Sequence, residues 1–156
     1  MSDENLVKLH IDLPNHWAIG GESMWATPLE NDLYQIENVP FFAYGLNFQD
    51  VVNATSDSDD LIPEIRFVVT PSGHRTYRIM FDKELTRDKQ VELLESLEVH
   101  GATYERANGK DVAIDIKPEG DHLAVYDQLD EYEASELLSF ETCEVRAEGS
   151  FDDLPE

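Results

Sequence analysis

The sequence has few basic residues for its length. Of 156 residues, 11 are Lys or Arg and 34 are Asp or Glu, so the formal net charge is −23. Such a charge repels DNA, RNA and anionic lipid head groups, which argues against a nucleic-acid-binding role, and it speeds encounter with basic macromolecules. Solubility alone is the simpler explanation of the charge. The acidic excess lies toward the two ends, because residues 61–118 hold ten acidic and nine basic side chains.

Long apolar runs and cysteine pairs are also missing. No apolar run reaches the roughly 18 residues that span a bilayer. The start MSDENLVKLH has no apolar signal core, so we expect a cytoplasmic location. Cys143 is the one cysteine of the sequence and therefore cannot form an internal disulfide or a thiolate metal site. We expect it to be a buried, inert thiol in a reducing compartment.

The first 72 residues show the two-residue alternation of β-strands and no helical pattern. LVKLHIDL, residues 6–13, predicts a strand with one wet face, and residues 30–32 predict a hairpin turn. FFAYGLNFQDVVNAT, residues 41–55, predicts a strand buried on both faces, in which Gly45 marks a bulge or bend. We therefore predict a small bent β-sheet or partly closed barrel over residues 1–72.

Residues 61–85, LIPEIRFVVTPSGHRTYRIMFDKEL, predict a hairpin whose turn lies at residues 71–74. Apolar side chains alternate along both of its strands: Ile65, Phe67 and Val69 on the first, then Tyr77, Ile79 and Phe81 on the second.

From residue 85 the apolar period changes to about 3.6 residues, as in a helix. Thr86 is the expected N-cap of a first helix that stops at Gly101, and Asp121 is the expected N-cap of a second. We place Leu123, Tyr126 and Leu129 on the buried face of the second helix. Two strands about an Asn-Gly turn separate the helices, and FETCEVRA forms the last strand.

These elements order residues 74–147 as strand, helix, strand, strand, helix and strand. That order is typical of a ferredoxin-like unit, in which two helices cover one face of a four-stranded sheet. The predicted fold class is therefore α+β, with a β-rich subdomain at residues 1–72, a ferredoxin-like βαββαβ subdomain at residues 73–147 and a frayed acidic tail at residues 148–156.

Motifs for catalysis, cofactors and metals are missing. The sequence has no phosphate-binding glycine loop and no nucleophile elbow. Asp57-Ser58-Asp59-Asp60 resembles the start of a calcium loop but lacks the later glycine and glutamate of an EF-hand, so we interpret it as a solvated turn. We predict no enzymatic activity, no cofactor and no metal. Histidines are scattered without ligand spacing: His10, His16, His74, His100 and His122.

Two sets of charged residues are candidate binding sites. Like charges on the second helix destabilise it by a few tenths of a kcal/mol per pair, a cost that a basic partner would offset. The predicted partner-binding residues are Asp57, Asp59, Asp60, Asp127, Asp130, Glu131, Glu133 and Glu136.

The alternative set is basic. Arg66 and Arg78 are expected to share a sheet face, where with His74 and Arg75 they could grip a carboxylate or phosphate. Internal ion pairs with the many carboxylates are the competing explanation.

A family resemblance accompanies these patterns. On the segments VKLHIDLP, ESMWATPLENDLYQIENVPFFAYGLNFQDVV and SGHRTYRIMF, the chain resembles the bacterial family known as domain of unknown function 4265. The resemblance implies a small bacterial cytoplasmic protein with a β-rich beginning and assigns no activity. In composition, the chain is also similar to the immunity proteins that neutralise polymorphic or contact-dependent toxins.

Two functional hypotheses follow. The first is a stoichiometric inhibitor, an immunity protein whose acidic surface occludes a basic toxin domain such as a nuclease. The second is a small-molecule-binding or regulatory module with an anionic-ligand site between the two subdomains.

Overall fold

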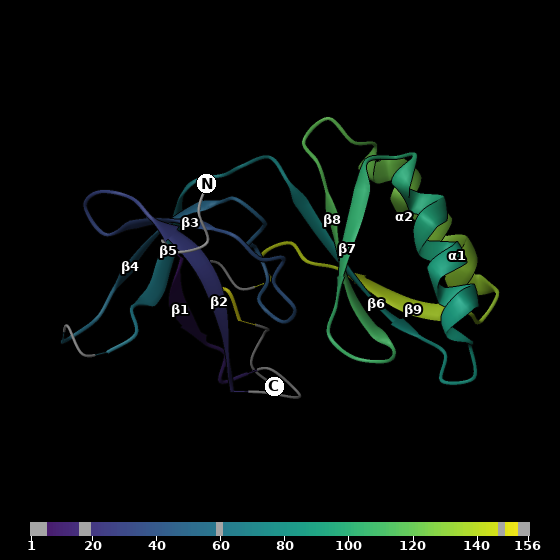
Figure 1. Ribbon diagram of the computed structural model, residues 1–156, viewed down its shortest axis with the longest axis horizontal. Coiled ribbons are helices and arrows are strands. Elements are labelled where there is room, and N and C mark those ends of the chain that lie inside the picture. The colour runs from purple at the N-terminus through teal and green to yellow at the C-terminus, as the bar shows by residue number, and fades with distance from the viewer. Residues whose placement is uncertain (1–5, 16–19, 59–60, 147–148, 153–156) are drawn as a thin grey trace. The chain divides into compact units, whose positions relative to one another are not determined.

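The computed structural model describes residues 6–15, 20–58, 61–146 and 149–152 (Figure 1). The chain forms two compact units, one made of Met1–Ser72 with Glu144–Glu156 and the other of Gly73–Cys143. The second unit is therefore inserted in the sequence of the first. One unit is a β-barrel and the other combines a sheet with two helices, which confirms the predicted α+β class.

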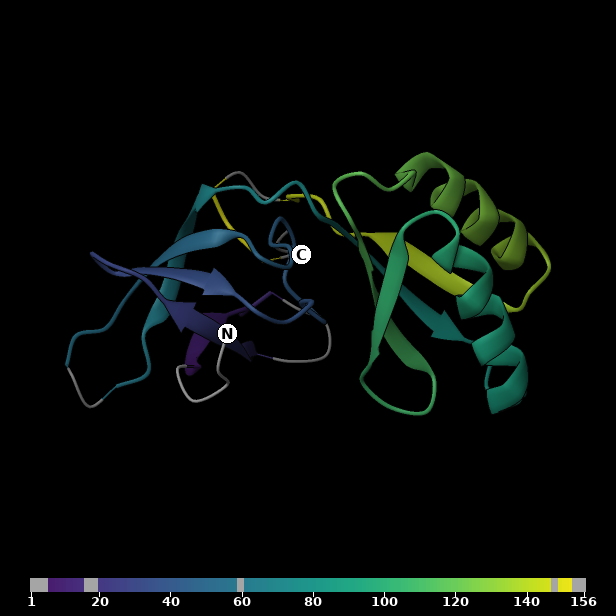
Figure 2. The same ribbon diagram turned by 45° about the horizontal axis from the view of Figure 1, so that its top comes forward.

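The first unit is a closed five-stranded barrel, in which each strand pairs antiparallel with the next (Figure 2). The first and last strands run parallel where they meet at His10 and Glu64. Leu9, Ile11 and Leu13 face the core, as the alternation in this segment predicts. The strands are β1 (Val7–Asp12), β2 (Gly21–Pro28), β3 (Leu33–Ile36), β4 (Val51–Thr55) and β5 (Glu64–Thr70).

The predicted hairpin at residues 30–32 is confirmed. Asn31 and Asp32 have φ angles of 59° and 63°, and the Leu33 N–H donates to the Glu30 carbonyl at 3.2 Å, so residues 30–32 form the tight turn between β2 and β3.

The predicted strand at residues 41–55 is wrong for its first ten residues, because only Val51–Thr55 is a strand. The backbone N–H groups of Phe41, Phe42 and Ala43 donate to the carboxylate of Glu22 instead of to a neighbouring strand. The chain then bends at Gly45, whose φ angle of 78° suits glycine. The expectation that this segment is core holds in part: Ala43, Tyr44 and Leu46 are buried, whereas Phe41 and Phe42 are half-buried.

A returning segment, described at residues 144–146 and 149–152, belongs to the barrel unit. The Tyr44 N–H donates to the Phe151 carbonyl (2.9 Å), and the Arg146 guanidinium lies 4.4 Å from the centre of the Tyr44 ring. Phe151 packs against the barrel core, and buried Asp152 accepts the Asn15 N–H at 2.8 Å. The predicted frayed tail is therefore wrong for the described residues 149–152.

The second unit is ferredoxin-like, as predicted. Its sheet has the strand order β7-β8-β6-β9, and both helices lie on the same face of this sheet (Figure 1). The elements are β6 (Arg75–Phe81), α1 (Arg87–Glu98), β7 (Ala102–Arg106), β8 (Asp111–Ile116), α2 (His122–Ala134) and β9 (Leu138–Thr142).

The predicted hairpin of residues 61–85 is wrong. β5 pairs with β4 and β1, while β6 pairs with β8 and β9, so the two strands belong to different sheets. Register shifts between β4 and β5 also break the alternation, which leaves Phe67 and Val69 exposed while Val68 packs against the core. Alternation identified two strands but not their partners.

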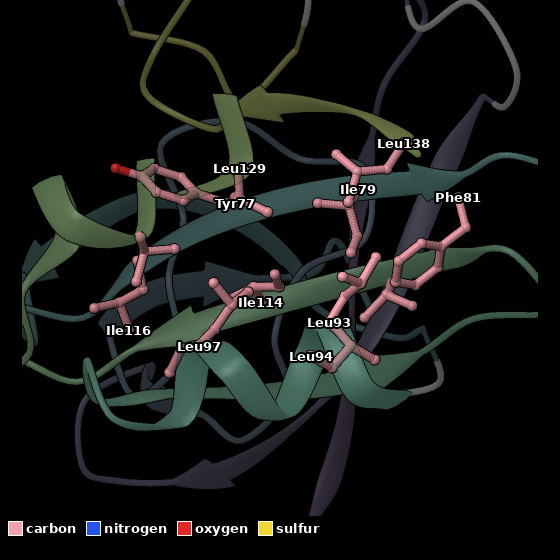
Figure 3. Packing of buried hydrophobic residues seen from close by; sticks show 13 residues of the cluster. Tyr77, Ile79, Phe81, Leu93, Leu94, Leu97, Ile114, Ile116, Leu129 and Leu138 are labelled. Carbon is pink, nitrogen blue, oxygen red and sulfur yellow. The ribbon is translucent and has the colours of Figure 1, made fainter. Parts of the chain in front are cut away.

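The core of the second unit lies between the helices and the sheet (Figure 3). Leu93, Leu94 and Leu97 of α1 point toward the sheet residues Phe81 and Ile114. This packing buries the apolar stripe that the 3.6-residue period predicts.

Both helix starts are confirmed, but the buried face of α2 is partly wrong. The Thr86 hydroxyl accepts the Lys89 N–H, and the Asp121 carboxylate accepts the Ala124 N–H. Val125 and Leu129 are the buried residues of α2, whereas Leu123 is 65% exposed and Tyr126 41% exposed. Val125 and Leu123 are two residues apart and therefore about 200° apart around the helix, so they point in nearly opposite directions. Because Val125 faces the core, Leu123 faces solvent.

Candidate functional site

The exposed side of α2 carries the largest predicted acidic set. The five carboxylates of this set are all on exposed residues: Asp127, Asp130, Glu131, Glu133 and Glu136. Asp127 and Asp130 are three residues apart, and Asp127 and Glu131 four, so their side chains are neighbours on the helix surface. The structure thus brings these five together on and just beyond one helix.

No basic residue compensates this face locally. Residues 118–145 contain nine Asp or Glu and no Lys or Arg. None of the five carboxylates forms an ion pair within the part of the chain that the structure describes. Helix α1 differs, since Arg87 and Lys89 occupy its first turn and Lys89 lies 3.4 Å from Glu92.

At the C-terminal end of α2 the charges also oppose the dipole of the helix, whereas the Asp121 cap at its start favours it. No acidic residue lies in its first turn, and no basic residue lies in its last turn. Glu131, Glu133 and Glu136 lie in or just after the last turn, where the partial negative charge of the C-terminus disfavours anions. The charge pattern therefore lowers the intrinsic stability of this helix.

The end of α2 has a second unfavourable feature. Glu136 has a φ angle of 62°, and its N–H donates to the Glu133 carbonyl, while the Leu137 N–H donates to the Tyr132 carbonyl. This is a Schellman end, at which glycine is the preferred residue because a Cβ atom is strained there.

Two of the five carboxylates have local hydrogen-bond partners. Glu133 accepts the Phe140 N–H at 3.1 Å, and Glu131 accepts the Gln128 side-chain amide at 3.2 Å. Glu133 thereby covers a backbone donor of the edge strand β9, which is a structural role. Asp127 and Asp130 have no such contact within the described residues, so they are the carboxylates best placed for a partner.

The other predicted acidic residues lie in the turn after β4. Asp57 is exposed in the first unit. Asp59 and Asp60 lie outside the described residues, so the grouping of this trio stays a prediction.

The alternative basic set is largely engaged in internal contacts. Arg66 donates to the Thr55 hydroxyl at 3.0 Å. Arg78 is buried and donates to Glu141 at 3.1 Å. The expectation that Arg66 and Arg78 share a sheet face is wrong, because β5 and β6 belong to different sheets. Arg75 is exposed.

His74, the fourth member of the basic set, binds the buried Asp115. Its Nδ1 lies 2.9 Å and 3.0 Å from the two carboxylate oxygens. Burial raises the pKa of Asp115, and the charge and hydrogen bond of His74 oppose that rise. This pairing fits the internal-pair explanation of the set, and the anionic-ligand site stays a prediction.

The comparisons with known proteins concern the family and the fold. The profile of the family described as domain of unknown function (DUF4265) matches residues 22–140. The chain belongs to the DUF4265 family. This DUF4265 chain is also similar to a solved structure titled "Novel crystal structure of a hypothetical protein from Neisseria gonorrhoeae", with a TM-score of 0.73 and 20% sequence identity over 88% of this chain and 93% of that one. At that identity the likeness supports the fold alone.

The search among curated proteins gives no match. The family membership confirms the resemblance seen in the sequence, whereas the compositional likeness to toxin immunity proteins receives no support from the comparisons.

Sequence reasoning missed a set of buried carboxylates in the barrel of this DUF4265 protein. Glu22 accepts three backbone N–H groups, and Asp50 accepts the Asn47 N–H at 2.9 Å and the Ser72 N–H at 2.8 Å. Glu22 lies two residues before the buried Met24 on β2, so both side chains point to the inside of the barrel. An acidic residue at such an inward-pointing position is the feature of the sequence that could have indicated this site. Asp50 gave no comparable sign.

Two further findings apply to the described residues of this DUF4265 chain. Within them, no three His, Cys, Asp or Glu side chains come together as a metal-binding group. No helix among them is long and apolar enough to cross a membrane.

Proposed function

We propose that this DUF4265 protein binds a basic protein partner through the acidic face of α2. We further propose that it acts as a stoichiometric inhibitor, as an immunity protein does when it occludes a toxin domain such as a nuclease. The observation that carries the proposal is the uncompensated charge of α2: the helix carries Asp127, Asp130, Glu131 and Glu133, and no Lys or Arg lies between positions 118 and 145.

The mechanism is occlusion without chemistry. A nuclease presents a cationic cleft because it must attract the phosphate backbone. An acidic protein surface competes for the same cleft, and long-range attraction accelerates its association at low salt. Asp127 and Asp130 can take part because neither has a partner within the described part of this chain.

Binding would also relieve a strain within the protein. Each like-charge pair at three- or four-residue spacing on α2 costs a few tenths of a kcal/mol, and the anions at the helix C-terminus add a similar amount. Cations of a partner would neutralise this repulsion, so part of the unfavourable energy of the free helix becomes a driving force for the complex.

The test compares two charge reversals that alter net charge equally. Asp127→Lys with Asp130→Lys changes α2, whereas Glu92→Lys with Glu95→Lys changes exposed positions of α1. Each variant and the parent chain is used to capture partners from a native lysate of the host bacterium. The association rate of each chain with the captured protein is then measured at several salt concentrations.

The expected result is a basic protein that the parent and the α1 variant capture and the α2 variant loses. Its association rate at low salt should fall about tenfold for the α2 variant and less than threefold for the α1 variant. Equal losses for both variants, or no basic partner for the parent, would contradict the proposal.

A further inference from the structure

Four exposed residues of α2 form one continuous patch. Leu123, Tyr126, Asp127 and Asp130 follow the spacing i, i+3, i+4, i+7, which places them on a single helix face. Leu123 and Tyr126 lie toward the N-terminal end of the patch, and Asp127 and Asp130 lie toward its C-terminal end. Side chains at these spacings are about 5–6 Å apart at Cβ, so apolar surface and two carboxylates lie side by side.

The aromatic member of this patch is held in place from behind. The Tyr126 ring meets Phe140 edge-on, with ring centres 5.3 Å apart and planes at 78°. It meets Tyr77 in a similar way at 6.4 Å and 73°. Tyr126 is nevertheless 41% exposed, and Leu123 is 65% exposed. A fixed, half-exposed aromatic ring loses little conformational entropy on binding, which is typical of interface hot spots.

We propose that this patch is an anchor for an arginine side chain of the basic partner, an inference that rests on the proposed function. The aliphatic stem packs on Leu123, the planar guanidinium lies against the Tyr126 ring, and its N–H groups donate to Asp127 and Asp130. A guanidinium stacks on aromatic rings and bonds carboxylates through two N–H groups at once. A lysine ammonium is a compact, strongly hydrated charge and uses only part of this surface.

The experiment titrates the ¹⁵N-labelled full chain with two peptides of equal charge, tetra-arginine and tetra-lysine, and follows amide chemical shifts. For the parent chain we expect both peptides to shift amides of α2 and tetra-arginine to bind at least threefold more tightly. Tyr126→Leu should reduce this arginine preference to less than 1.5-fold, while Tyr126→Phe, which keeps the ring, should retain it.

Two further variants separate the parts of the patch. Leu123→Ala changes an exposed side chain and should reduce the affinity for tetra-arginine more than the affinity for tetra-lysine. Asp127→Asn with Asp130→Asn should reduce the affinity for both peptides at least threefold. The matched change on α1, Glu92→Gln with Glu95→Gln, should change neither affinity more than 1.5-fold. Far-UV circular dichroism checks that each variant is folded.

The outcomes distinguish the two proposals. Equal affinity of both peptides for α2 would overturn the arginine anchor and leave the acidic docking face intact. Shifts that avoid α2 altogether would count against both proposals. Arginine preference that survives Tyr126→Leu would overturn the role of the ring.

Discussion

The barrel unit and the ferredoxin-like unit contain the same number of acidic residues and use them differently. The barrel unit has 17 acidic and 3 basic residues, and the ferredoxin-like unit has 17 and 8. In the barrel, Glu22, Asp50 and Asp152 are buried and accept backbone N–H groups of irregular segments. On α2, Asp127 and Asp130 remain exposed.

The difference follows from local structure. An irregular segment has N–H groups that no strand or helix satisfies, and burying them without a partner costs free energy. A carboxylate accepts several such groups at once. The N–H groups of a helix interior are already satisfied, so Asp127 and Asp130 on α2 have no equivalent structural task. The buried carboxylates Glu22, Asp50 and Asp152 therefore stabilise the barrel, whereas Asp127 and Asp130 on α2 stay exposed to solvent.

The largest expected effect comes from removing the returning segment. A chain ending at Cys143 loses the packing of Phe151, the ring contact of Arg146 and two hydrogen bonds to the barrel unit. We expect the unfolding free energy of the barrel to fall by about 4 kcal/mol. Both tryptophans of the sequence lie within residues 1–72, so their fluorescence in urea measures this loss.

The matched control is a chain ending at Asp152, which keeps all of these contacts. Both described helices belong to the ferredoxin-like unit, so circular dichroism at 222 nm follows that unit separately. Equal destabilisation of the two shorter chains would contradict the prediction.

Glu22→Ala should destabilise the barrel by about 3 kcal/mol, because three backbone donors lose a charged acceptor. Glu22→Gln keeps one carbonyl acceptor and should have an intermediate effect. Asp127→Ala, on the exposed face of α2, should change stability by less than about 0.5 kcal/mol. Similar losses for Glu22→Ala and Asp127→Ala in urea unfolding would break the comparison between the units.

Glu136→Gly should stabilise the ferredoxin-like unit by about 1 kcal/mol, because glycine adopts a positive φ angle without strain. The change also removes an anion from the helix C-terminus. The neighbouring Ser135, whose φ angle is −88°, provides the control: Ser135→Gly should give no gain. Thermal unfolding followed at 222 nm measures both, and a loss of stability in Glu136→Gly would contradict the prediction.

The smallest expected effect concerns Asp115, a buried carboxylate of the second unit that binds a side chain, His74. Burial raises the pKa of Asp115 above its usual value of 3.8. The folded state then holds the proton more tightly than the unfolded state, so the contribution of this group to stability is greatest at low pH and declines as pH rises through the folded pKa.

Asp115→Asn should remove that decline. Its stability relative to the parent chain should therefore increase from pH 3.5 to pH 7, by a small amount because His74 opposes the shift. Urea unfolding of both chains at several pH values measures the difference, and a constant offset would show that burial does not govern this carboxylate.

The sequence was informative where structure is local. Thr86 and Asp121 cap their helices because capping depends on a few adjacent residues. The order of elements in the ferredoxin-like unit followed from changes of the apolar period, the Asn108-Gly109 turn and the residues that begin and end the helices. The pairing of β5 was not predictable in this way, because strand partners are set by contacts distant in the chain. The same holds for Phe41 to Ala43, whose N–H groups bind a side chain about twenty positions away.

The candidate site was predicted in part. The acidic residues of α2 were visible because charge is a property of composition, and an exposed helix face needs no distant partner. The exposure of Leu123 and Tyr126 could not be predicted. The helix has two apolar stripes, and which of them is buried, here the one with Val125 and Leu129, depends on how the helix packs on the sheet. Both apolar members of the proposed arginine anchor were therefore missed.

The insertion of one unit within the other has a consequence for synthesis. Ribosomes add about 5–20 residues per second, so the 71 residues of Gly73–Cys143 take about 4–14 s. During that interval, the nascent barrel lacks the carbonyl of Phe151 and the carboxylate of Asp152, to which Tyr44 and Asn15 donate. The ferredoxin-like unit is translated without interruption and is complete at Cys143, whereas the barrel, whose five strands are made first, still waits for the returning segment. The earlier half of the chain is therefore the last to acquire all its native contacts.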